Sequence, residues 1–250
     1  MKKIKWKHIN LLLLFLCIAS FTAHLILYPK FPDQVPVHWG IDGEVDRYSS
    51  KTSVLFLAVL PLFICILFYL IPMIDPRRKN YKYHSKAYHV CLSLTVLFLI
   101  VMNWVSSLIA LGYHFDISQI IVFGIGILFI GLGNYMPQIR PNYSFGVRTP
   151  WAIENPWVWK KTQRIGGILF MIMGIALLPF SFLPDSVLFP ILMGMLLGSM
   201  GIVYLYSYRM FLKAQKMGYF VENEMQSEKA EESSYHQNSE KENYNFSESQ

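Results

Sequence analysis

Long apolar blocks separated by short polar segments form the dominant pattern along the chain. A helix of about 20 apolar residues spans the hydrocarbon core of a bilayer, so uncharged blocks of this length predict transmembrane helices. Six blocks qualify, and none has Lys, Arg, Asp or Glu in its interior: Ile9–Tyr28, Thr52–Ile74, Val90–Leu111, Ile117–Met136, Ile165–Leu183 and Val187–Tyr208. The pattern predicts an all-α fold, a polytopic integral membrane helical bundle of about six transmembrane helices.

The first block also shares features with a secretory signal, because Met1–Lys7 contains four lysines and precedes a Leu-rich stretch. Three observations argue against that alternative. The block is long for the apolar region of a signal, no small-x-small cleavage site follows it, and Leu16 before Cys17 is wrong for lipidation. A first transmembrane helix is therefore favoured.

Lys and Arg alternate between the two sides of the predicted membrane. Cytoplasmic segments of membrane proteins carry an excess of these residues. The N-terminal segment and the segments after the second, fourth and sixth blocks, the last counted to residue 221, hold 17 Lys and Arg, against 3 on the other side. We therefore expect a multi-pass protein of the cell membrane, with both termini cytoplasmic and residues 29–51 outside.

Composition and charge exclude several classes of protein. Hydrophobic residues make up 54% of the 250 residues and charged residues only 15%, against roughly 25% charged residues in soluble domains. Residues 222–250 are rich in Glu, Ser, Asn and Gln and carry a net charge of −6, which predicts a disordered acidic cytoplasmic tail. The rest of the chain carries +12. Basic loops beside an anionic leaflet account for that charge, so we expect the lipid bilayer as a partner and no direct nucleic-acid binding.

The predicted spans contain few groups that could form a transport path. An ion- or proton-coupled transporter usually has an ionisable residue near the midplane. Asn103 is one of the few polar residues in the spans, and we interpret it as a hydrogen bond between helices, with a substrate ligand as the alternative. Cys17, Cys65 and Cys91 lie within spans without Cys/His metal spacing, so we expect small hydrophobic packing roles and no metal or cofactor.

Glycines in two predicted spans suggest close contacts between helices. Small residues allow helix backbones to approach in membranes. The fourth span has Gly124, Gly126, Gly131 and Gly133, and the sixth has Gly194, Gly198 and Gly201. We therefore expect both spans to supply packing surfaces within a compact bundle.

The outer segment 29–51 is the only sizeable part expected outside. Its prolines favour an extended path and Asp42-Gly43 indicates a tight turn, which predicts an ordered loop or short hairpin over the helices. His38, Asp42 and Asp46 are candidate metal ligands or acid–base groups. No second cluster supports that chemistry, and structural roles for His38 and Trp39 are favoured. Binding of an extracellular ligand is the more plausible function of this loop.

The inner segment 137–164 has an unusual composition for a juxtamembrane loop. Three tryptophans suit the headgroup zone and its arginines suit phosphates. A simple membrane anchor would need neither its four prolines nor a turn at Gly146. We therefore predict a folded re-entrant or interfacial element, either structural or functional.

Several motifs resemble those of the SdpI family of membrane proteins. They are Gly133-Asn-Tyr-Met-Pro137, Phe145-Gly-Val-Arg-Thr-Pro-Trp151 and Val158-Trp-Lys-Lys-Thr-Gln-Arg-Ile-Gly-Gly167, together with Ile74-Asp-Pro-Arg-Arg-Lys-Asn-Tyr81. The outer loop, with Pro36, His38-Trp39 and Asp42-Gly43, resembles the domain of unknown function in the first half of such proteins. The resemblance covers about residues 28–221. Ala152 and Gln163 depart from the usual Thr and His, and Gln163 argues against acid–base chemistry at that position.

The resemblance implies a non-enzymatic immunity and signalling protein of the sporulation-delaying toxin system. Such proteins bind or neutralise a secreted toxic peptide, and the best-known members also hold an ArsR-type repressor at the inner surface. We expect three regions: 1–88, a first helical hairpin with the outer loop and a basic inner loop; 89–221, an SdpI-like four-helix half with the inner loop 137–164; and the disordered acidic tail 222–250, which lies outside the resemblance. A small-solute or peptide transporter and a membrane enzyme using the outer His and Asp residues remain alternatives.

The two loops supply the candidate site residues. The predicted ligand-binding residues of the outer loop are Tyr28, His38, Trp39, Asp42, Gly43 and Asp46. The predicted residues of an inner signalling loop are Asn134, Pro137, Arg140, Asn142, Gly146, Arg148, Thr149, Pro150, Trp151, Trp159, Thr162 and Arg164. We expect no catalytic residues.

Overall fold

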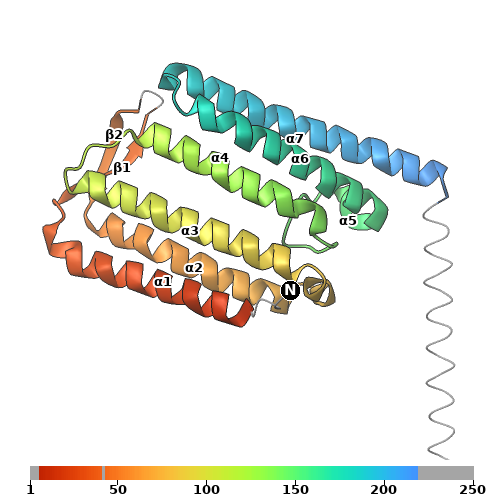
Figure 1. Ribbon diagram of the computed structural model, residues 1–250, viewed down its shortest axis with the longest axis horizontal. Coiled ribbons are helices and arrows are strands. Elements are labelled where there is room, and N and C mark those ends of the chain that lie inside the picture. Colours follow the sequence, from red (N-terminus) through yellow and green to blue (C-terminus); the bar gives the residue numbers. More distant parts are fainter. Residues whose placement is uncertain (1–5, 41–42, 219–250) are drawn as a thin grey trace, which may run out of the picture.

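The described residues of the protein form a bundle of six long helices with short elements at both ends (Figure 1). The computed structural model describes residues 6–40 and 43–218, with side chains from residue 10 onward. The long helices are α1 (Trp6–Leu27), α2 (Thr52–Ile74), α3 (Ser85–Ala110), α4 (Ile117–Tyr135), α6 (Pro156–Phe180) and α7 (Asp185–Lys216). Each is long and apolar enough to cross a membrane, which confirms the six predicted spans.

The short elements lie at opposite ends of the bundle. They are η1 (Tyr28–Lys30), β1 (Gln34–Trp39), β2 (Val45–Ser50), η2 (Arg78–Lys82), η3 (Met136–Gln138) and α5 (Pro150–Glu154). The β1–β2 hairpin lies beside the start of α4, whereas η2 and α5 lie at the other end (Figure 1). Following the predicted orientation, we name these the outer end and the inner end.

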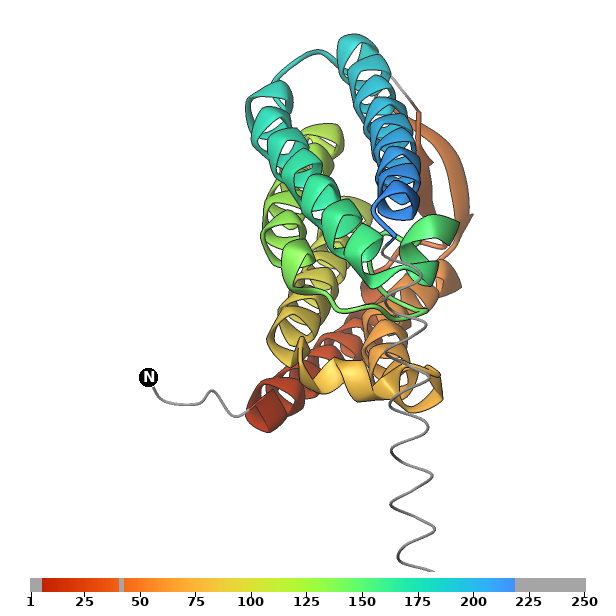
Figure 2. The same ribbon diagram turned by 90° about the vertical axis from the view of Figure 1, so that its right-hand side faces the viewer.

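The long helices form two groups that meet along α3 and α4 (Figure 2). The first group is α1, α2 and α3, and the second is α4, α6 and α7. In the first group, Leu13 and Cys17 of α1 are buried together with Cys65 of α2 and Leu92 of α3. Because α1 contributes to this core, it is part of the folded bundle, as expected for a first transmembrane helix.

Two glycine pairs bring α4 and α6 into backbone contact. A Cβ atom on Gly133 would lie 2.6 Å from the carbonyl oxygen of Gly167, and one on Gly174 would lie 2.6 Å from that of Gly126. Each distance is too short for any side chain, so glycine is required for this helix spacing. The structure confirms the expected close contact of the fourth span.

The glycines of α7 do not contribute such a contact, and that expectation was wrong for this chain. Cβ atoms added to Gly194, Gly198 or Gly201 would have no described neighbour within 4 Å. The buried residues of α7 include Leu188 and Val203, which lie on another face. Packing of α7 therefore uses its larger side chains, and the small-residue face points away from the described bundle.

The start of α6 differs from the predicted span, which began at Ile165. Asn155 caps the helix, since its side-chain oxygen accepts hydrogen bonds from the backbone N–H groups of Trp157 and Val158. Pro156 fits the first helical position because its missing N–H would have no partner in the helix. The last part of the predicted inner loop is therefore helical and extends α6 beyond the apolar stretch.

Candidate functional site: an outer hairpin and an inner clasp

The outer segment folds into an antiparallel hairpin. Pro36 pairs with Tyr48 and His38 with Arg47, with an irregular register around His38. The turn is closed by a hydrogen bond from the Gly40 N–H to the Glu44 carbonyl. Gly43 has φ +78°, a left-handed conformation that favours glycine. The predicted site residue Asp42 lies outside the described residues.

The hairpin brings two of the predicted site residues into contact. His38 Nδ1 lies 2.7 Å from Asp46 Oδ1, and the side chains are 57% and 50% exposed. The sequence spacing alone did not show this contact, because it depends on strand register. In the described part of the chain, no group of three His, Cys, Asp or Glu residues is arranged to hold a metal ion. The pair is an exposed cross-strand contact accessible to a ligand.

Apolar and charged contacts fix the base of the hairpin to the helices. Phe31 and Val35 are buried against Val54 at the start of α2. Lys51 pairs with Asp33 at 3.1 Å, and its ammonium lies over the ring of half-buried Tyr28, 5.5 Å from the centroid. Tyr28, a predicted binding residue, thus contributes to the base of the hairpin.

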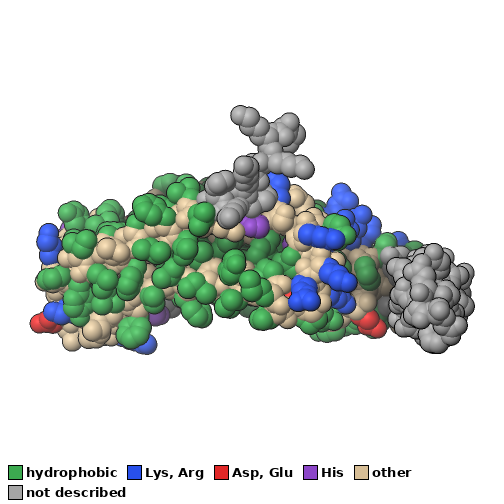
Figure 3. All heavy atoms as spheres, turned by 90° about the horizontal axis from the view of Figure 1, so that it is seen from below, with side chains coloured by type: hydrophobic (Ala, Val, Ile, Leu, Met, Phe, Trp, Pro, Cys, Tyr) green, Lys and Arg blue, Asp and Glu red, His purple; other side chains and the backbone are tan. Residues whose placement is uncertain are grey.

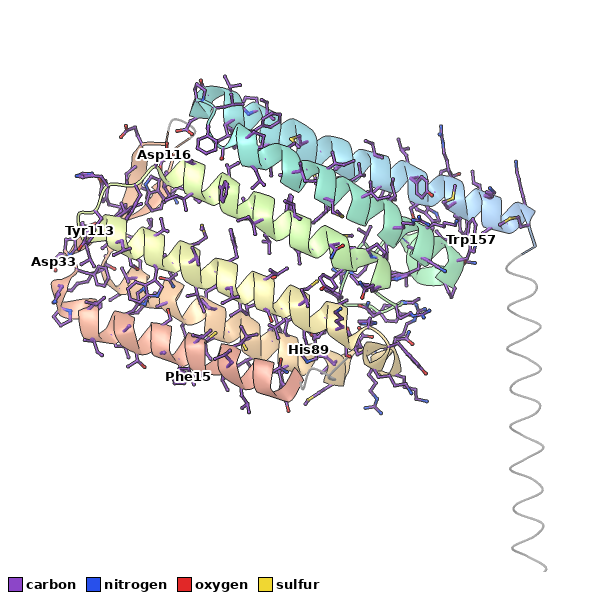
Figure 4. The ribbon with its side chains drawn as sticks, viewed as in Figure 1. Phe15, Asp33, His89, Tyr113, Asp116 and Trp157 are labelled. Atoms are coloured by element: carbon purple, nitrogen blue, oxygen red, sulfur yellow. The ribbon has the colours of Figure 1, made fainter. Side chains whose placement is uncertain are left out.

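The tip of the hairpin reaches the second helix group. A Cβ atom on Gly43 would collide with the Asp185 carboxylate and would lie 3.4 Å from Ser118 Oγ. Asp185 begins α7 and Ser118 belongs to the first turn of α4. The hairpin therefore bridges the two helix groups at the outer end, where Figure 4 also places Asp33, Tyr113 and Asp116.

Sequence reasoning missed part of the exposed hairpin surface. Arg47 is exposed and Tyr48 is 59% exposed, whereas Trp39 is half-buried. Apolar and polar residues do not alternate along Val45–Ser50, and the successive residues Asp46, Arg47 and Tyr48 are all exposed, so no local pattern marked this surface. We define the outer hairpin surface as His38, Trp39, Asp46, Arg47 and Tyr48.

At the inner end, one buried carboxylate joins the two inner loops. Asp75 is 3% exposed and follows α2. It accepts hydrogen bonds from the Arg77 N–H at 2.8 Å, the Tyr81 hydroxyl at 2.8 Å, the Tyr143 N–H at 3.0 Å and the Ser144 hydroxyl at 2.9 Å. The first two donors lie in its own loop and the last two in the loop after α4. Asp75 therefore connects the first helix group to the second.

The surroundings of Asp75 favour its charged form. Burial alone would raise the pKa of this carboxyl, but the hydrogen bonds from Arg77, Tyr81, Ser144 and Tyr143 outweigh that effect and lower it. Burial, together with the hydrogen bond to Asp75, raises the pKa of the Tyr81 hydroxyl. The ionised carboxylate and neutral phenol form a donor–acceptor pair at neutral pH.

Two further residues complete the contact between the inner loops. Asn80 donates to the Pro141 carbonyl at 2.7 Å, and His84 Nδ1 accepts from the Arg140 N–H at 3.2 Å. The His84 ring stacks on Phe145, with centroids 6.4 Å apart. Burial and the nearby Arg140 charge lower the pKa of His84 to about 4. We name Asp75, Asn80, His84 and the facing segment 139–145 the inner clasp.

Four of the predicted inner residues are buried and hold backbone or helix contacts. Asn142 accepts from the Ser144 and Phe145 N–H groups, and Trp159 donates to the Ile139 carbonyl at 2.7 Å. The Thr149 and Thr162 hydroxyls both contact the Ser207 hydroxyl of α7. All four have relative exposure of 5% or less, so a ligand cannot reach them without rearrangement.

The turn at Gly146 depends on the residue that departs from the family pattern. Gly146 has φ +95°, and Gln163 packs directly against it. The Gln163 side chain accepts from the Val147 N–H at 3.1 Å and donates to the Val147 carbonyl at 2.7 Å. The Gln163 amide thus pairs with the Val147 backbone as a neighbouring β-strand would. Gln163 therefore has a structural role.

Trp151 anchors α5 to α7 through ring contacts. Its ring centroid lies 4.9 Å from that of Tyr204 and 5.0 Å from that of Tyr208.

The remaining predicted inner residues are exposed: Asn134, Pro137, Arg140, Arg148, Pro150 and Arg164. We define the inner basic surface as Arg140, Arg148 and Arg164. Figure 3 shows Lys and Arg gathered toward this end of the face that it displays.

Within the membrane, polar groups of α1 and α3 bind one another. His24 Nδ1 lies 2.7 Å from the Ser20 carbonyl and Nε2 lies 3.0 Å from the Ser107 hydroxyl, while Trp104 donates to the Ser20 hydroxyl. Asn103 belongs to the same buried cluster through its contact with Ser107. The cluster fits the interpretation of Asn103 as a helix-packing residue.

Comparison with known proteins covers both halves of this architecture. Residues 15–69, from α1 through the hairpin to α2, match a domain of unknown function, DUF1648. Residues 138–207, from the inner clasp to α7, match the SdpI/YfhL protein family. Its second half is similar to the SdpI family. The predicted resemblance, the fold class and the multi-pass membrane location are thereby confirmed.

The chain is also similar to a curated relative along most of its length. It is 28% identical over 205 residues to the immunity protein SdpI of Bacillus subtilis (strain 168), which covers 82% of this chain and 96% of that protein. No solved structure matches it. The hairpin lies within the DUF1648 match, whereas segment 139–145 of the inner clasp lies within the SdpI/YfhL match. Asp75, Asn80 and His84 of the inner clasp lie between the two matched segments.

Proposed function

We propose that this protein is an immunity protein, a non-enzymatic membrane receptor that binds or neutralises a secreted toxic peptide. The observation that carries the proposal is the similarity to an immunity protein over 96% of that relative's length. The similarity extends over 82% of this chain. The two family matches include the hairpin and segment 139–145 of the inner clasp, which supports a shared mode of action.

The outer hairpin surface is the proposed receptor site. It presents an imidazole–carboxylate contact between His38 and Asp46, the Arg47 guanidinium and the exposed Tyr48 ring. Aromatic and guanidinium groups contribute most strongly to peptide and protein recognition. The hairpin also contacts both helix groups, so a ligand that moves it would act on both.

The inner basic surface is the proposed output site, where a cytoplasmic repressor of the ArsR type would be held. Arg148 is exposed and its guanidinium donates to the Tyr143 carbonyl in the inner clasp at 2.5 Å. A partner carboxylate can pair with the remaining guanidinium donors. Arg148 therefore couples a docking surface to the segment that Asp75 holds.

The proposed immunity is tested by challenging toxin-sensitive cells with secreted peptide toxin, with and without the protein. Survival should rise with membrane abundance of the protein. Equal killing at high and zero abundance would contradict the proposal.

The output site has a separate test that measures repressor recruitment to the membrane. Arg148→Ala should reduce recruitment at unchanged abundance, because the partner loses a charge-assisted contact. Arg209→Ala is the matched control, since Arg209 is an exposed inner arginine of α7 outside the proposed surface. Equal recruitment by the two variants would refute the assignment of Arg148.

A further inference from the structure

The inner ends of α1, α2 and α3 enclose a cavity that neither proposed surface uses. Its volume is about 850 Å³, which lies within the range of small-molecule sites. Figure 4 shows His89, one of its lining residues, at this end of the bundle. Other lining residues come from the first turns of α1, the last turns of α2, the helix η2 and the start of α3.

The walls of the cavity are apolar and its mouth opens sideways. Leu11 of α1 is 55% exposed, and Ile66 and Met73 of α2 are 47% and 54% exposed. Leu92 and Cys65 are buried and form its inner wall. Because the exposed lining residues belong to membrane-spanning helices, the mouth faces the acyl chains of the inner leaflet.

The inner end of the same cavity is polar and basic. Lys82 of η2, Ser85 at the start of α3 and Asn10 of α1 line it. The Asn10 side-chain oxygen is buried and has no hydrogen-bond partner among the described residues. Buried polar atoms are normally satisfied, so an unpartnered one beside a cavity indicates a missing donor.

The charge around the mouth selects the headgroup. Lys82 lines the cavity, and Arg78 and Lys79 belong to the same short helix, η2. A basic residue near a membrane surface attracts anionic lipid. A zwitterionic headgroup would not gain this attraction to the same extent.

We propose that this cavity binds a phospholipid of the inner leaflet with an anionic headgroup. One acyl chain occupies the apolar space between α1 and α2, and the headgroup lies at Lys82 and Ser85, with a headgroup hydroxyl donating to Asn10. A bound lipid would occupy the cavity of the first helix group, next to the inner clasp. This inference concerns a different part of the protein from the proposed receptor and output sites and does not depend on them.

The test is native mass spectrometry of the full chain, delipidated and titrated with phosphatidylglycerol or phosphatidylcholine carrying identical acyl chains. Phosphatidylglycerol should bind more tightly. Leu14→Trp, which fills the apolar part, should weaken this binding at least tenfold. Leu12→Trp is the matched control, since Leu12 is 57% exposed on the same helix and does not line the cavity.

The headgroup assignment has its own pair of variants. Lys82→Gln should reduce the preference for phosphatidylglycerol about fivefold, whereas Lys79→Gln, which removes the same charge from the same short helix, should change it less. Equal binding of both lipids by the unaltered protein would overturn the headgroup assignment. Binding that Leu14→Trp and Leu12→Trp affect equally would overturn the cavity as the lipid site.

Discussion

Asp75 shows how a single side chain can join two halves of a membrane protein. Its four hydrogen-bond donors come from both inner loops, and no cation within 4.0 Å balances its charge in the described part of the chain. Removing the partner of a buried donor costs about 1–3 kcal/mol. The free energy of this connection therefore depends on the Asp75 carboxylate. Asp75 belongs to a motif noted in the sequence, but it was not among the predicted site residues.

Asp75→Asn should lower the free energy of unfolding by about 1–3 kcal/mol, because an amide cannot accept all four hydrogen bonds. Thermal unfolding in detergent measures this. Asp116→Asn is the control: Asp116 caps α4 by accepting from the Gln119 N–H, and Asn caps helices equally well. A melting temperature for Asp75→Asn equal to that of the control would show that the inner clasp does not depend on the carboxylate.

His84 makes the inner clasp sensitive to acid. Its pKa is about 4 in the folded protein, against 6.5 for an unperturbed histidine. Between these values the unfolded chain binds more protons, so this contribution to stability is complete above pH 6.5 and is lost as the pH falls towards 4. Below the Asp75 pKa, protonation of that carboxyl removes a further contribution.

His84→Gln should therefore flatten the decrease in melting temperature between pH 7 and pH 4.5. Glutamine can still accept from the Arg140 N–H, so the variant should fold. His114→Gln is the control, because His114 is exposed in the outer loop between α3 and α4. If the two variants lose stability in parallel over this range, the titration does not arise at His84.

At the scale of elements, some glycines allow two helices to pack closely, whereas others lie on open surface. Gly133 and Gly167 allow α4 and α6 to meet backbone to backbone, whereas Gly194 and Gly198 match a packing motif and meet nothing described. The composition of the two stretches is similar. Which glycines make helix contacts therefore depends on how the helices are arranged in the bundle.

Gly133→Ala should destabilise the protein by about 1–3 kcal/mol, because the new methyl group overlaps the Gly167 carbonyl. Gly198→Ala should leave stability unchanged or slightly raised, since alanine favours the helix and has open space. Thermal unfolding of the two variants in the same detergent compares them. Similar losses for both would contradict the close α4–α6 packing.

The spans could be predicted from the sequence because apolar length alone determines them, whereas the contacts between loops could not. Hydropathy gives α2 and α4 to within one residue at each end, whereas α1 and α3 begin three and five residues earlier than predicted. The helix α6 also begins earlier, because Asn155 and Pro156 start it before the apolar stretch. The His38–Asp46 contact depends on strand register, and the Asp75 contacts join positions nearly 70 residues apart. Such pairings carry no local periodicity.

The whole molecule has two distinct ends, and its orientation is open to direct measurement. The structure places Asp116 at the end with the hairpin and Arg78 at the other (Figures 1 and 4). The excess of Lys and Arg predicts that the Arg78 end is cytoplasmic. The three native cysteines are buried in spans, so they should give little background.

In intact cells, an impermeant maleimide should label Asp116→Cys and should label Arg78→Cys only after the membrane is opened. Labelling of Arg78→Cys from outside would reverse the predicted orientation, and with it the assignment of receptor and output ends.

The central claim is that the outer hairpin surface receives the toxic peptide. Cells carrying the double variant His38→Ala, Tyr48→Ala should be killed by toxin at doses that cells with the unaltered protein survive, at equal membrane abundance. Tyr113→Ala is a matched control, since Tyr113 is also an outer tyrosine with 59% exposure. It should protect like the unaltered protein. Full protection by the double variant would contradict the assignment of the hairpin as the receptor site.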